Sequence, residues 1–389
     1  MTKLDELIQE LCPDGVEFVS MNELLKRKQI STITPTIKVK RNDYLDIGET
    51  PIISQEIEYI SGYCNFHDKN IPCGNYVCFG DHSEHIKYIN FSFVQGADGL
   101  KIMRTNESTI SSRYLFHALS SKYQRHNNYE RHFKYLTDTI IPVPPLPVQR
   151  EIVRILDNFT ELTAELTAER TARKKQYAYY RDKLLTHSSE TKICKLADVC
   201  ESIADGDHMP PPKADDGIPF ITISNITEQN KIDFSNTMFV PSSYYDALAD
   251  KRKPHSGDIL YTVVGSYGIP VCIEQDTKFV FQRHIAILRP RSEVIKARYM
   301  FHAMQSGAFK AQADKAAKGA AQKTIGLSSL AEMTLPVPDM CIQERLIHVL
   351  DNFDAICTDL NIGLPAEIEA RQKQYEYYRD KLLSFEEKT

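Results

Sequence analysis

A ten-residue segment occurs twice in this chain with one difference, as QYAYYRDKLL at residues 176–185 and as QYEYYRDKLL at residues 374–383. We call these segments the first and second decapeptides. A match of this length and quality indicates an internal duplication, which the fold of the chain must accommodate.

The duplication extends well upstream of the decapeptides. RYLFHA at residues 113–118 matches RYMFHA at 298–303, and ILDNF at 155–159 matches VLDNF at 349–353. The first match has a shift of 185 positions, and the second has a shift of 194. A shift that changes within the unit indicates insertions and excludes a short-period solenoid, so the chain consists of two large copies.

The chain has 389 residues, more than one hydrophobic core normally supports. We therefore expect two globular domains, at residues 1–141 and 191–335, each followed by a helical region, at 142–190 and 336–389. Short β-like runs with Gly, Pro and Asn punctuation predict that both domains are α+β. The predicted fold is thus α+β, with two domains separated by two long antiparallel helical regions and related by an internal pseudo-two-fold axis.

Both helical regions carry an apolar stripe with the spacing of an α-helix. Apolar residues fall at i, i+3, i+4, i+7, i+10 and i+14 in each copy, which forms a narrow seam suited to another helix. We expect the two stripes to pack on each other as an antiparallel pair. Their members are Ile152, Ile155, Leu156, Phe159, Leu162 and Leu166 in the first copy, and Leu346, Val349, Leu350, Phe353, Ile356 and Leu360 in the second.

A tetrapeptide repeat, FTEL-TAEL-TAER, occupies residues 159–170 of the first helical region. Four residues turn a helix by about 400° and lengthen it by about 6 Å, so an added unit keeps the apolar face within about 40° of register. This pattern predicts an adjustable spacer, with an ordinary coiled-coil stalk as the alternative. In the second copy Gly363 and Pro365 predict that one helix ends and another begins.

Positive charge is concentrated in equivalent parts of the two copies, although the whole chain has a net charge of −5. Residues 101–134 contain seven Lys and Arg against two Glu, and residues 296–323 contain six against one Asp. Such a segment suits contacts with phosphates and base edges, while a solvated helix face is the alternative. The candidate nucleic-acid contacts are Lys101, Arg131, His132 and Lys134 in the first copy, Lys318, Gln322 and Lys323 in the second, and Gly80, Asp81 and His82 as a further candidate loop.

An arginine and a histidine lie four residues apart at matching places in the two copies. The pairs are Arg113 with His117 and Arg298 with His302. Because both copies share them, we favour a role in the common framework over a role in recognition.

The sequence contains no cofactor or nucleotide motif. The segment at residues 318–324 lacks the glycine that precedes the lysine of a phosphate-binding loop. A cluster of Cys and His lacks the paired spacing of zinc sites and has no match in the second copy. We therefore expect no metal ligands and no catalytic residues in this chain. The cluster comprises Cys64, His67, Cys73, Cys78, His82 and His85.

The polar N-terminus and the lack of any apolar run long enough to span a bilayer predict a soluble, cytoplasmic protein without membrane contact. The nine cysteines are odd in number and scattered, so reduced thiols are expected.

At this point the chain resembles the specificity subunit of type I restriction-modification systems. The resemblance covers essentially the full length and rests on the ILDNF, RKKQYxYYRDKLL and GLPAEIEAR stretches in the helical regions. The TAEL unit at residues 163–166 points to one branch of that family.

The resemblance implies that each globular domain is a target-recognition domain that reads one half of an interrupted double-stranded DNA target. The helical regions, conserved in that family, would set the gap and dock two modification subunits. Those partners would hold S-adenosylmethionine and methylate adenine N6, and restriction subunits would add ATP- and Mg-dependent translocation and cleavage. This chain would bind no cofactor and perform no chemistry. A protein-only adaptor built on a helical pair and an unrecognised enzyme are the alternatives.

Overall fold

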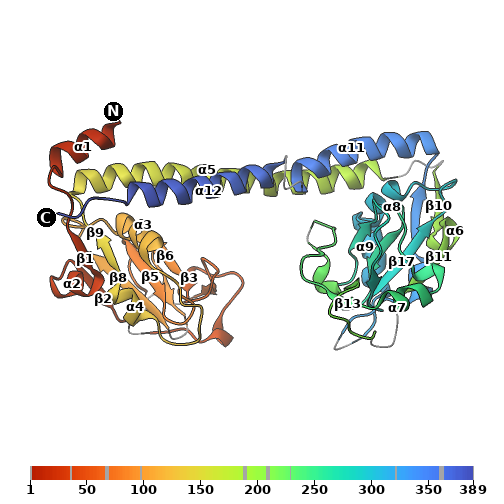
Figure 1. Ribbon diagram of the computed structural model, residues 1–389, viewed down its shortest axis with the longest axis horizontal. Coiled ribbons are helices and arrows are strands. Elements are labelled where there is room, and N and C mark those ends of the chain that lie inside the picture. Colours follow the sequence, from red (N-terminus) through yellow and green to blue (C-terminus); the bar gives the residue numbers. More distant parts are fainter. Residues whose placement is uncertain are drawn as a thin grey trace. The chain divides into compact units, whose positions relative to one another are not determined.

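The computed structural model of the chain divides into two compact units (Figure 1). Unit 1 comprises Met1–Glu165 with Ile368–Thr389, and unit 2 comprises Leu166–Glu367. The described residues are 2–35, 37–65, 70–96, 99–186, 191–206, 211–227, 229–319, 322–358 and 363–388.

Unit 1 contains the first globular domain, the first half of one long helix and most of the last helix. Its elements are α1 (Lys3–Leu11), β1 (Phe18–Ser20), α2 (Met21–Lys26), β2 (Ile30–Ile33), η1 (Arg41–Asp43), β3 (Thr50–Ile53), β4 (Gly62–Cys64), β5 (Tyr76–Gly80), β6 (Ile86–Ile89), β7 (Val94–Gln95), β8 (Leu100–Thr105), α3 (Ser112–Lys122), α4 (Phe133–Asp138), β9 (Ile140–Pro142), the start of α5 (Leu146–Leu184) and most of α12 (Leu364–Leu382).

Unit 2 contains the second half of α5, the second globular domain and the following helix. Its further elements are β10 (Lys192–Lys195), α6 (Leu196–Val199), β11 (Cys200–Asp205), β12 (Ile218–Ile221), η2 (Ile223–Asn225), β13 (Met238–Val240), α7 (Ser242–Ala247), η3 (Asp250–Arg252), β14 (Ile259–Thr262), β15 (Pro270–Cys272), β16 (Val280–Phe281), β17 (Ile285–Pro290), α8 (Ala297–Met304), α9 (Gly307–Ala316), α10 (Leu327–Glu332), β18 (Thr334–Val337) and α11 (Met340–Thr358).

The two domains share one sheet topology. The strand orders are β2-β8-β5-β6, β4-β3-β7 and β1-β9 in unit 1, and β11-β17-β14-β15, β13-β12-β16 and β10-β18 in unit 2. In each three-stranded sheet the central strand has one antiparallel and one parallel neighbour. The predicted α+β class and the internal duplication are confirmed, because each strand of one domain has a counterpart in the other.

One inner strand of each four-stranded sheet, β5 in unit 1 and β14 in unit 2, is buried on both faces. Val77 and Phe79 of β5 pack with α3 in one hydrophobic cluster, while Tyr76 and Cys78 point into a second cluster on the opposite face. Strand β14 has the same arrangement, with alternate residues in two clusters. This alternation follows from the two-residue period of a strand. A four-stranded sheet covered on both sides gives each domain a rigid base for its loops.

The first helical region is one long helix. Helix α5 runs without interruption from Leu146 to Leu184 and includes the whole tetrapeptide repeat. In the second copy α11 ends at Thr358 and α12 begins at Leu364, beside Gly363 and Pro365 as predicted.

Each decapeptide packs into the unit that contains the globular domain of the other copy. Tyr177 and Leu185 of the first decapeptide belong to the core of unit 2. Leu383 of the second decapeptide is completely buried in the core of unit 1, with Tyr375 packed beside it. Each globular domain therefore packs against the decapeptide of the other copy and not against its own.

The expectation that the two apolar stripes pack on each other is wrong. Ile152 and Leu156 are buried in the core of unit 1, and Leu350 is buried in the core of unit 2. Phe159 stacks on Tyr378 of α12 with ring centroids 5.3 Å apart, and Phe353 stacks on Tyr177 at 6.4 Å. Each stripe thus contacts its own domain and the decapeptide of the other copy. Ile155, Leu346 and Phe353 pack at the edges of these cores, Leu166 is half-buried, Leu162, Val349 and Ile356 are exposed, and Leu360 lies outside the described residues.

The N- and C-terminal segments of the described chain meet in unit 1 (Figure 1). Val16 pairs with Glu387 in a parallel bridge, in which its N–H donates to the carbonyl of Glu386 at 2.9 Å and its carbonyl accepts from Lys388 at 3.0 Å. Helix α12 therefore runs antiparallel to the first half of α5, as predicted for the helical regions.

Candidate nucleic-acid interface

The structure brings together two of the predicted segments in the first domain. We define the first recognition loops as residues 81–85, which follow β5, and residues 123–132, which join α3 to α4. The backbone N–H of His132 donates to the carbonyl of Asp81 at 2.8 Å, and the N–H of Phe133 donates to its carboxylate at 2.9 Å. In unit 1 these loops lie beside α4, on the side of the sheet away from α5 and α12 (Figure 1).

Glu84 holds the first recognition loops together, and no sequence pattern predicted this role. Its buried carboxylate accepts the hydroxyl of Tyr123 at 2.6 Å and the backbone N–H groups of His126 at 2.9 Å and Asn127 at 2.8 Å. Burial opposes ionisation, but these hydrogen bonds outweigh it and lower the pKa of Glu84 to about 2. A permanently charged carboxylate therefore holds the loop at residues 123–132 in one shape.

Three of the predicted contacts in the first domain are structural. His132 is completely buried, Asp81 is 3% exposed, and Gly80 ends the buried strand β5. The His132 ring binds the Asp81 carbonyl through Nδ1 and the Asn128 side chain through Nε2. The prediction that His132 contacts DNA is wrong for this conformation, because both ring nitrogens already have partners inside the protein.

Other residues of the first recognition loops are accessible. Arg131 and Lys134 are exposed, and Tyr129 is 91% exposed with its ring stacked on His82. Lys134 pairs with Glu130 at 2.9 Å, and the partly exposed Lys101 pairs with Asp81 at 3.5 Å. An exposed ion pair such as Lys134–Glu130 contributes little to stability, so Lys134 can exchange partners, whereas the Asp81 carboxylate that pairs with Lys101 is buried.

The second domain presents its candidates between α9 and α10. We define the second recognition loops as residues 263–269, which follow β14, and the described residues 317–319 and 322–326 between these helices. Lys318 and Thr324 exchange backbone hydrogen bonds of 2.9 and 2.8 Å, and the N–H of Gly265 donates to the carbonyl of Lys323 at 3.0 Å. Lys318, Gln322 and Lys323 are exposed. Gly319 has φ +121°, and a Cβ there would lie 2.3 Å from the Gln322 carbonyl, so the turn requires glycine.

The recognition loops of the two domains occupy equivalent places in the shared topology. In each domain one loop follows the central strand of the four-stranded sheet, and the other precedes the short helix α4 or α10. The framework is therefore the same, while the exposed side chains on it differ.

A polar hub around a completely buried histidine joins each domain to the helical regions, and its members are matched between the copies. The first hub is Arg113, His117, Asp157 and Tyr375; the second hub is Arg298, His302, Asp351 and Tyr177. In the first hub His117 Nε2 lies 2.9 Å from Asp157 Oδ1, and His117 Nδ1 lies 3.1 Å from the Tyr375 hydroxyl. In the second hub the corresponding distances are 2.6 and 3.1 Å.

Protonation in the hubs follows from burial and from the partners. Burial of the completely enclosed rings lowers the pKa of His117 and of His302, so both are neutral at pH 7. A neutral ring beside a carboxylate carries its hydrogen on Nε2 and donates it to the aspartate. Nδ1 is then an acceptor for the tyrosine hydroxyl, and the arginine Nε donates to the same aspartate oxygen, at 2.8 Å in the first hub and 2.6 Å in the second.

Comparison with known proteins agrees with the duplicated fold. The profile of the family described as type I restriction modification DNA specificity domain matches residues 13–174 and 188–370. The chain belongs to this family.

Relatives in the type I specificity family match over most of the chain. The Escherichia coli EcoR124I/EcoR124II specificity subunit is 30% identical over 99% of this chain and 97% of its own length. A putative specificity subunit from Haemophilus influenzae is 31% identical over 63% of each chain. Both of these relatives are described as specificity subunits.

Solved specificity subunits share the fold of this family member. The type I S subunit from M. genitalium has a TM-score of 0.52 at 13% identity and covers 95% of this chain and 96% of its own. A chain from a study of type I complex assembly has a TM-score of 0.57 at 16% identity, with 96% and 98% covered.

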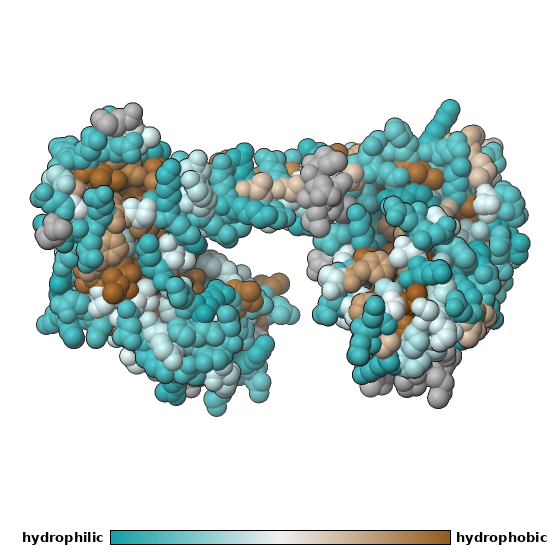
Figure 2. Space-filling model, viewed as in Figure 1, coloured by the Kyte–Doolittle hydropathy of each residue, from teal (hydrophilic) through white to brown (hydrophobic). Residues whose placement is uncertain are grey.

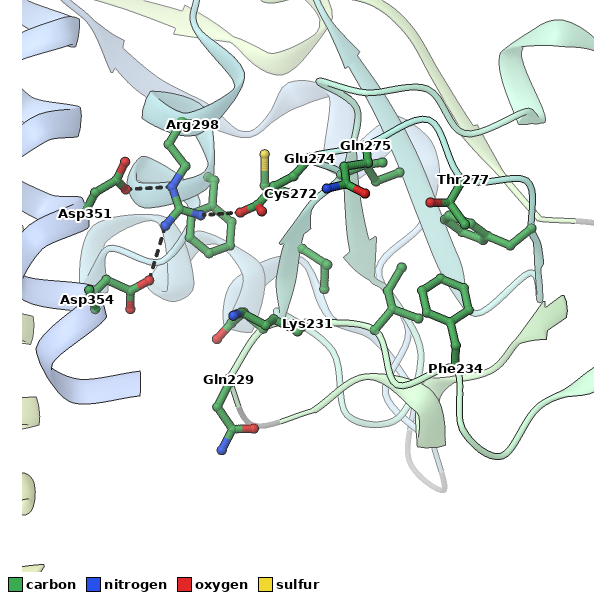
Figure 3. Close-up of a pocket in the computed structure, with 17 residues that line it drawn as sticks. Gln229, Lys231, Phe234, Cys272, Glu274, Gln275, Thr277, Arg298, Asp351 and Asp354 are labelled. Atoms are coloured by element: carbon green, nitrogen blue, oxygen red, sulfur yellow. Dashed lines mark hydrogen bonds and ion pairs between the residues drawn. The ribbon is translucent and has the colours of Figure 1, made fainter. Parts of the chain in front are cut away.

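A cavity of about 340 Å³ in the second specificity domain lies against the second hub (Figure 3). Arg298 points toward Asp351 and Asp354 of α11 on one side and toward Glu274 on the other. Cys272 lines this cavity, and burial raises the pKa of its thiol to about 11. At the matching register in the first domain stands Tyr88, whose ring packs 4.6 Å from the Arg113 guanidinium carbon. Cys272 thus stands at the cavity where the first domain has a tyrosine.

Among the described residues of this specificity subunit, no group of three His, Cys, Asp or Glu is placed to hold a metal ion. His67, one of the cluster considered for zinc, lies outside the described residues. Within the described parts of the chain, no helix is both long and apolar enough to cross a bilayer.

The sequence did contain a signal for the hubs. Each of their residue types recurs at a matched position of the duplication, and the favoured framework role of the Arg–His pairs agrees with their burial. The aspartate and tyrosine partners were missed because they lie in other segments of the chain.

Proposed function

We propose that this chain confers DNA sequence specificity on a type I restriction-modification complex, with each domain reading one half of a bipartite target. The observation that carries this proposal is the contrast between a shared framework and unlike exposed loops. Arg131, Lys134 and Tyr129 stand on the first recognition loops, while Lys318, Gln322 and Lys323 stand on the second. Two different surfaces on one scaffold suit two different half-sites.

The chemistry of these side chains suits DNA. Arginine and lysine donate to guanine and to phosphates, glutamine matches adenine, and an exposed tyrosine can pack on sugar or base. We assign Arg131, Lys134, Lys318, Gln322 and Lys323 to the DNA face, with Lys101 behind the first loops and His82 as the support of Tyr129. The domain boundaries that we propose remain residues 1–141, 142–190, 191–335 and 336–389.

The helical regions offer the same exposed residues twice, which suits two copies of one partner. Tyr179 and Tyr377 occupy the same place in the two decapeptides and are 63% and 62% exposed. Leu162 and Ile356 occupy the same place in the two stripes and are 45% and 50% exposed. The space-filling view shows a mostly hydrophilic surface with separate hydrophobic patches (Figure 2). We propose that each unit docks one modification subunit through its exposed pair.

The partners then supply what this chain lacks. We propose that two modification subunits hold S-adenosylmethionine and methylate adenine, and that restriction subunits, with ATP and Mg, add translocation and cleavage. The complex acts on double-stranded DNA and therefore resides in the cytoplasm. The α5 spacer and the helices beside it set the gap between the half-sites.

The test is a mobility-shift and methylation assay with the chain alone, with the modification subunit alone and with both. We expect sequence-specific DNA binding and methyl transfer only from the mixture. Stable assembly without DNA binding would favour a protein-only adaptor. Methyl transfer from S-adenosylmethionine by the isolated chain would instead show that it is an enzyme.

A further inference from the structure

The two hubs are the points at which three separate helices meet in each unit. In unit 1 the histidine comes from α3, the aspartate from α5 and the tyrosine from the second decapeptide in α12. In unit 2 the same three roles fall to α8, α11 and the first decapeptide in α5. One ring therefore bonds a domain simultaneously to the helix of its own copy and to the helix of the other.

A second contact repeats on each decapeptide five residues after the tyrosine. Asp380 accepts the hydroxyl of Ser121, near the end of α3, at 2.8 Å. Asp182 accepts the backbone N–H of Gly307, at the start of α9, at 3.2 Å. Two attachment points on one helix fix a direction as well as a position, because rotation about either point breaks the other.

Directional bonds matter here because the surrounding contacts are apolar. Apolar packing has little directional preference, whereas hydrogen bonds require their donors and acceptors to align. In both hubs each histidine ring nitrogen is enclosed and has a partner, which is the aspartate carboxylate for Nε2 and the tyrosine hydroxyl for Nδ1. Loss of one donor leaves a buried acceptor unpaired and removes the penalty for small tilts of the domain.

We propose that the two hubs set the angle of each recognition domain on its helical support and so determine, together with the helix length, which target gap is read. This inference rests on the proposed function. A domain of about 140 residues is about 37 Å across, so a tilt of about 5° moves its far end by about 3.2 Å. That displacement is close to the rise of one base pair, about 3.4 Å along each strand. The hub residues are positioning residues, since they touch no DNA.

The test removes one oxygen from each hub with Tyr375→Phe and Tyr177→Phe, singly and together. Matched controls are Tyr114→Phe and Tyr299→Phe. These tyrosines lie on α3 and α8 and are at least as enclosed as the hub tyrosines, but their hydroxyls bond to carbonyls of their own copy, at Pro142 and Pro336. The controls therefore lose a buried hydrogen bond without detaching a domain from the other copy.

The measurement uses the full chain in complex with its modification subunit and a DNA library in which the two half-sites are separated by gaps of varied length. Sequencing of methylated products gives the yield at each gap. We expect wild type and both controls to prefer one gap, and the hub variants to methylate neighbouring gaps about tenfold more than wild type does, with unchanged half-site sequences. Retained methylation at the original gap shows that a hub variant has folded.

Hub variants that methylate only the original gap, at whatever rate, would overturn the inference. So would controls that broaden the gap to the same degree, since any weakened domain would then have this effect. For a hub variant that loses all methylation, we test whether it still co-purifies with the modification subunit as wild type does. If it assembles yet reads no gap, the hubs do not merely set an angle, and the proposal fails. The absence of any bipartite methylation by wild type would instead overturn the proposed function.

Discussion

The hydroxyl of Tyr375 lies 3.1 Å from Nδ1 of His117, although 258 positions separate these residues in the chain. Tyr177 and His302 have the same relationship at the same distance in the other unit. The decapeptides are therefore nearly identical for a structural reason, since each must fit the hub of the opposite copy.

The hubs predict a fall in stability on mild acidification. Burial lowers the pKa of His117 and His302 below the usual 6.5, while the histidines of the unfolded chain keep it. As the pH falls below about 6.5, these histidines become protonated in the unfolded chain but stay neutral in the folded chain. The free energy of unfolding therefore decreases. The stabilisation is fully present above that pH and is lost toward the lower pKa of the folded state.

Thermal unfolding midpoints of wild type and of a His117→Gln, His302→Gln double variant between pH 8 and pH 5 check this expectation. We expect wild type to lose more stability over this interval than the double variant. His85 and His284, whose pKa values burial also lowers, are present in both proteins and cancel in the comparison. Parallel curves for the two proteins would contradict the assignment.

Glu84 predicts a defect confined to one half-site. In Glu84→Gln the amide NH₂ faces backbone N–H groups in place of a carboxylate oxygen, so the loop at residues 123–132 loses part of its anchor. We expect about 1–3 kcal/mol lower stability of the first domain and weaker selection at its half-site, with the other half-site unchanged. Methylation of a library randomised in each half-site measures this, with the exposed Glu10→Gln as control. Equal loss at both half-sites would point to a general folding defect.

Lys134→Ala and Lys323→Ala are expected to affect different half-sites. A lost phosphate contact weakens binding and flattens its salt dependence, whereas a lost base contact relaxes one half-site by about 1–3 kcal/mol. Both lysines are exposed, so assembly is expected to be unchanged. Salt-dependent binding and motif selection by the assembled complex measure the effects. Unchanged binding and methylation in both variants would move the recognition surface elsewhere.

An additional Thr-Ala-Glu-Leu unit after Leu166 is expected to lengthen the gap and leave both half-sites intact. The inserted turn preserves the helical face to within about 40° and adds about 6 Å to α5, which corresponds to one to two base pairs at most. We expect a gap near six base pairs in the unaltered target and about one more in the variant, because half-sites about one helical turn apart face one side of the duplex. Methylation mapping in the same host gives both values. A change within a half-site at a fixed gap would contradict the role of the helix as a spacer.

The organisation of the fold could be predicted from the sequence, but the packing partner of each apolar stripe could not. The duplication, the α+β class and the break at Gly363 could be predicted because repeats and helix-breaking residues act locally. The pairing of the stripes could not, since an apolar stripe fits a stripe or a decapeptide equally well, and the observed partners are Tyr378 and Tyr177.

The candidate site shows the same division. Charge and position selected the segments that we propose for DNA recognition, and the structure brings the two segments of the first domain together. Individual roles could not be read from composition, because His132 and Arg131 are neighbours in sequence but one is enclosed and the other exposed. The role of Glu84 could not be predicted because it depends on backbone N–H groups more than forty positions away in the sequence.

The central claim is that one chain reads a bipartite target with two domains. Methylome sequencing of a host that expresses this chain with its modification subunit tests it most directly. We predict a single adenine-methylated motif of two unlike half-sites at one fixed gap, in which Lys134→Ala relaxes one half and Lys323→Ala the other. A contiguous motif without a gap, or methylation that does not depend on this chain, would contradict the account.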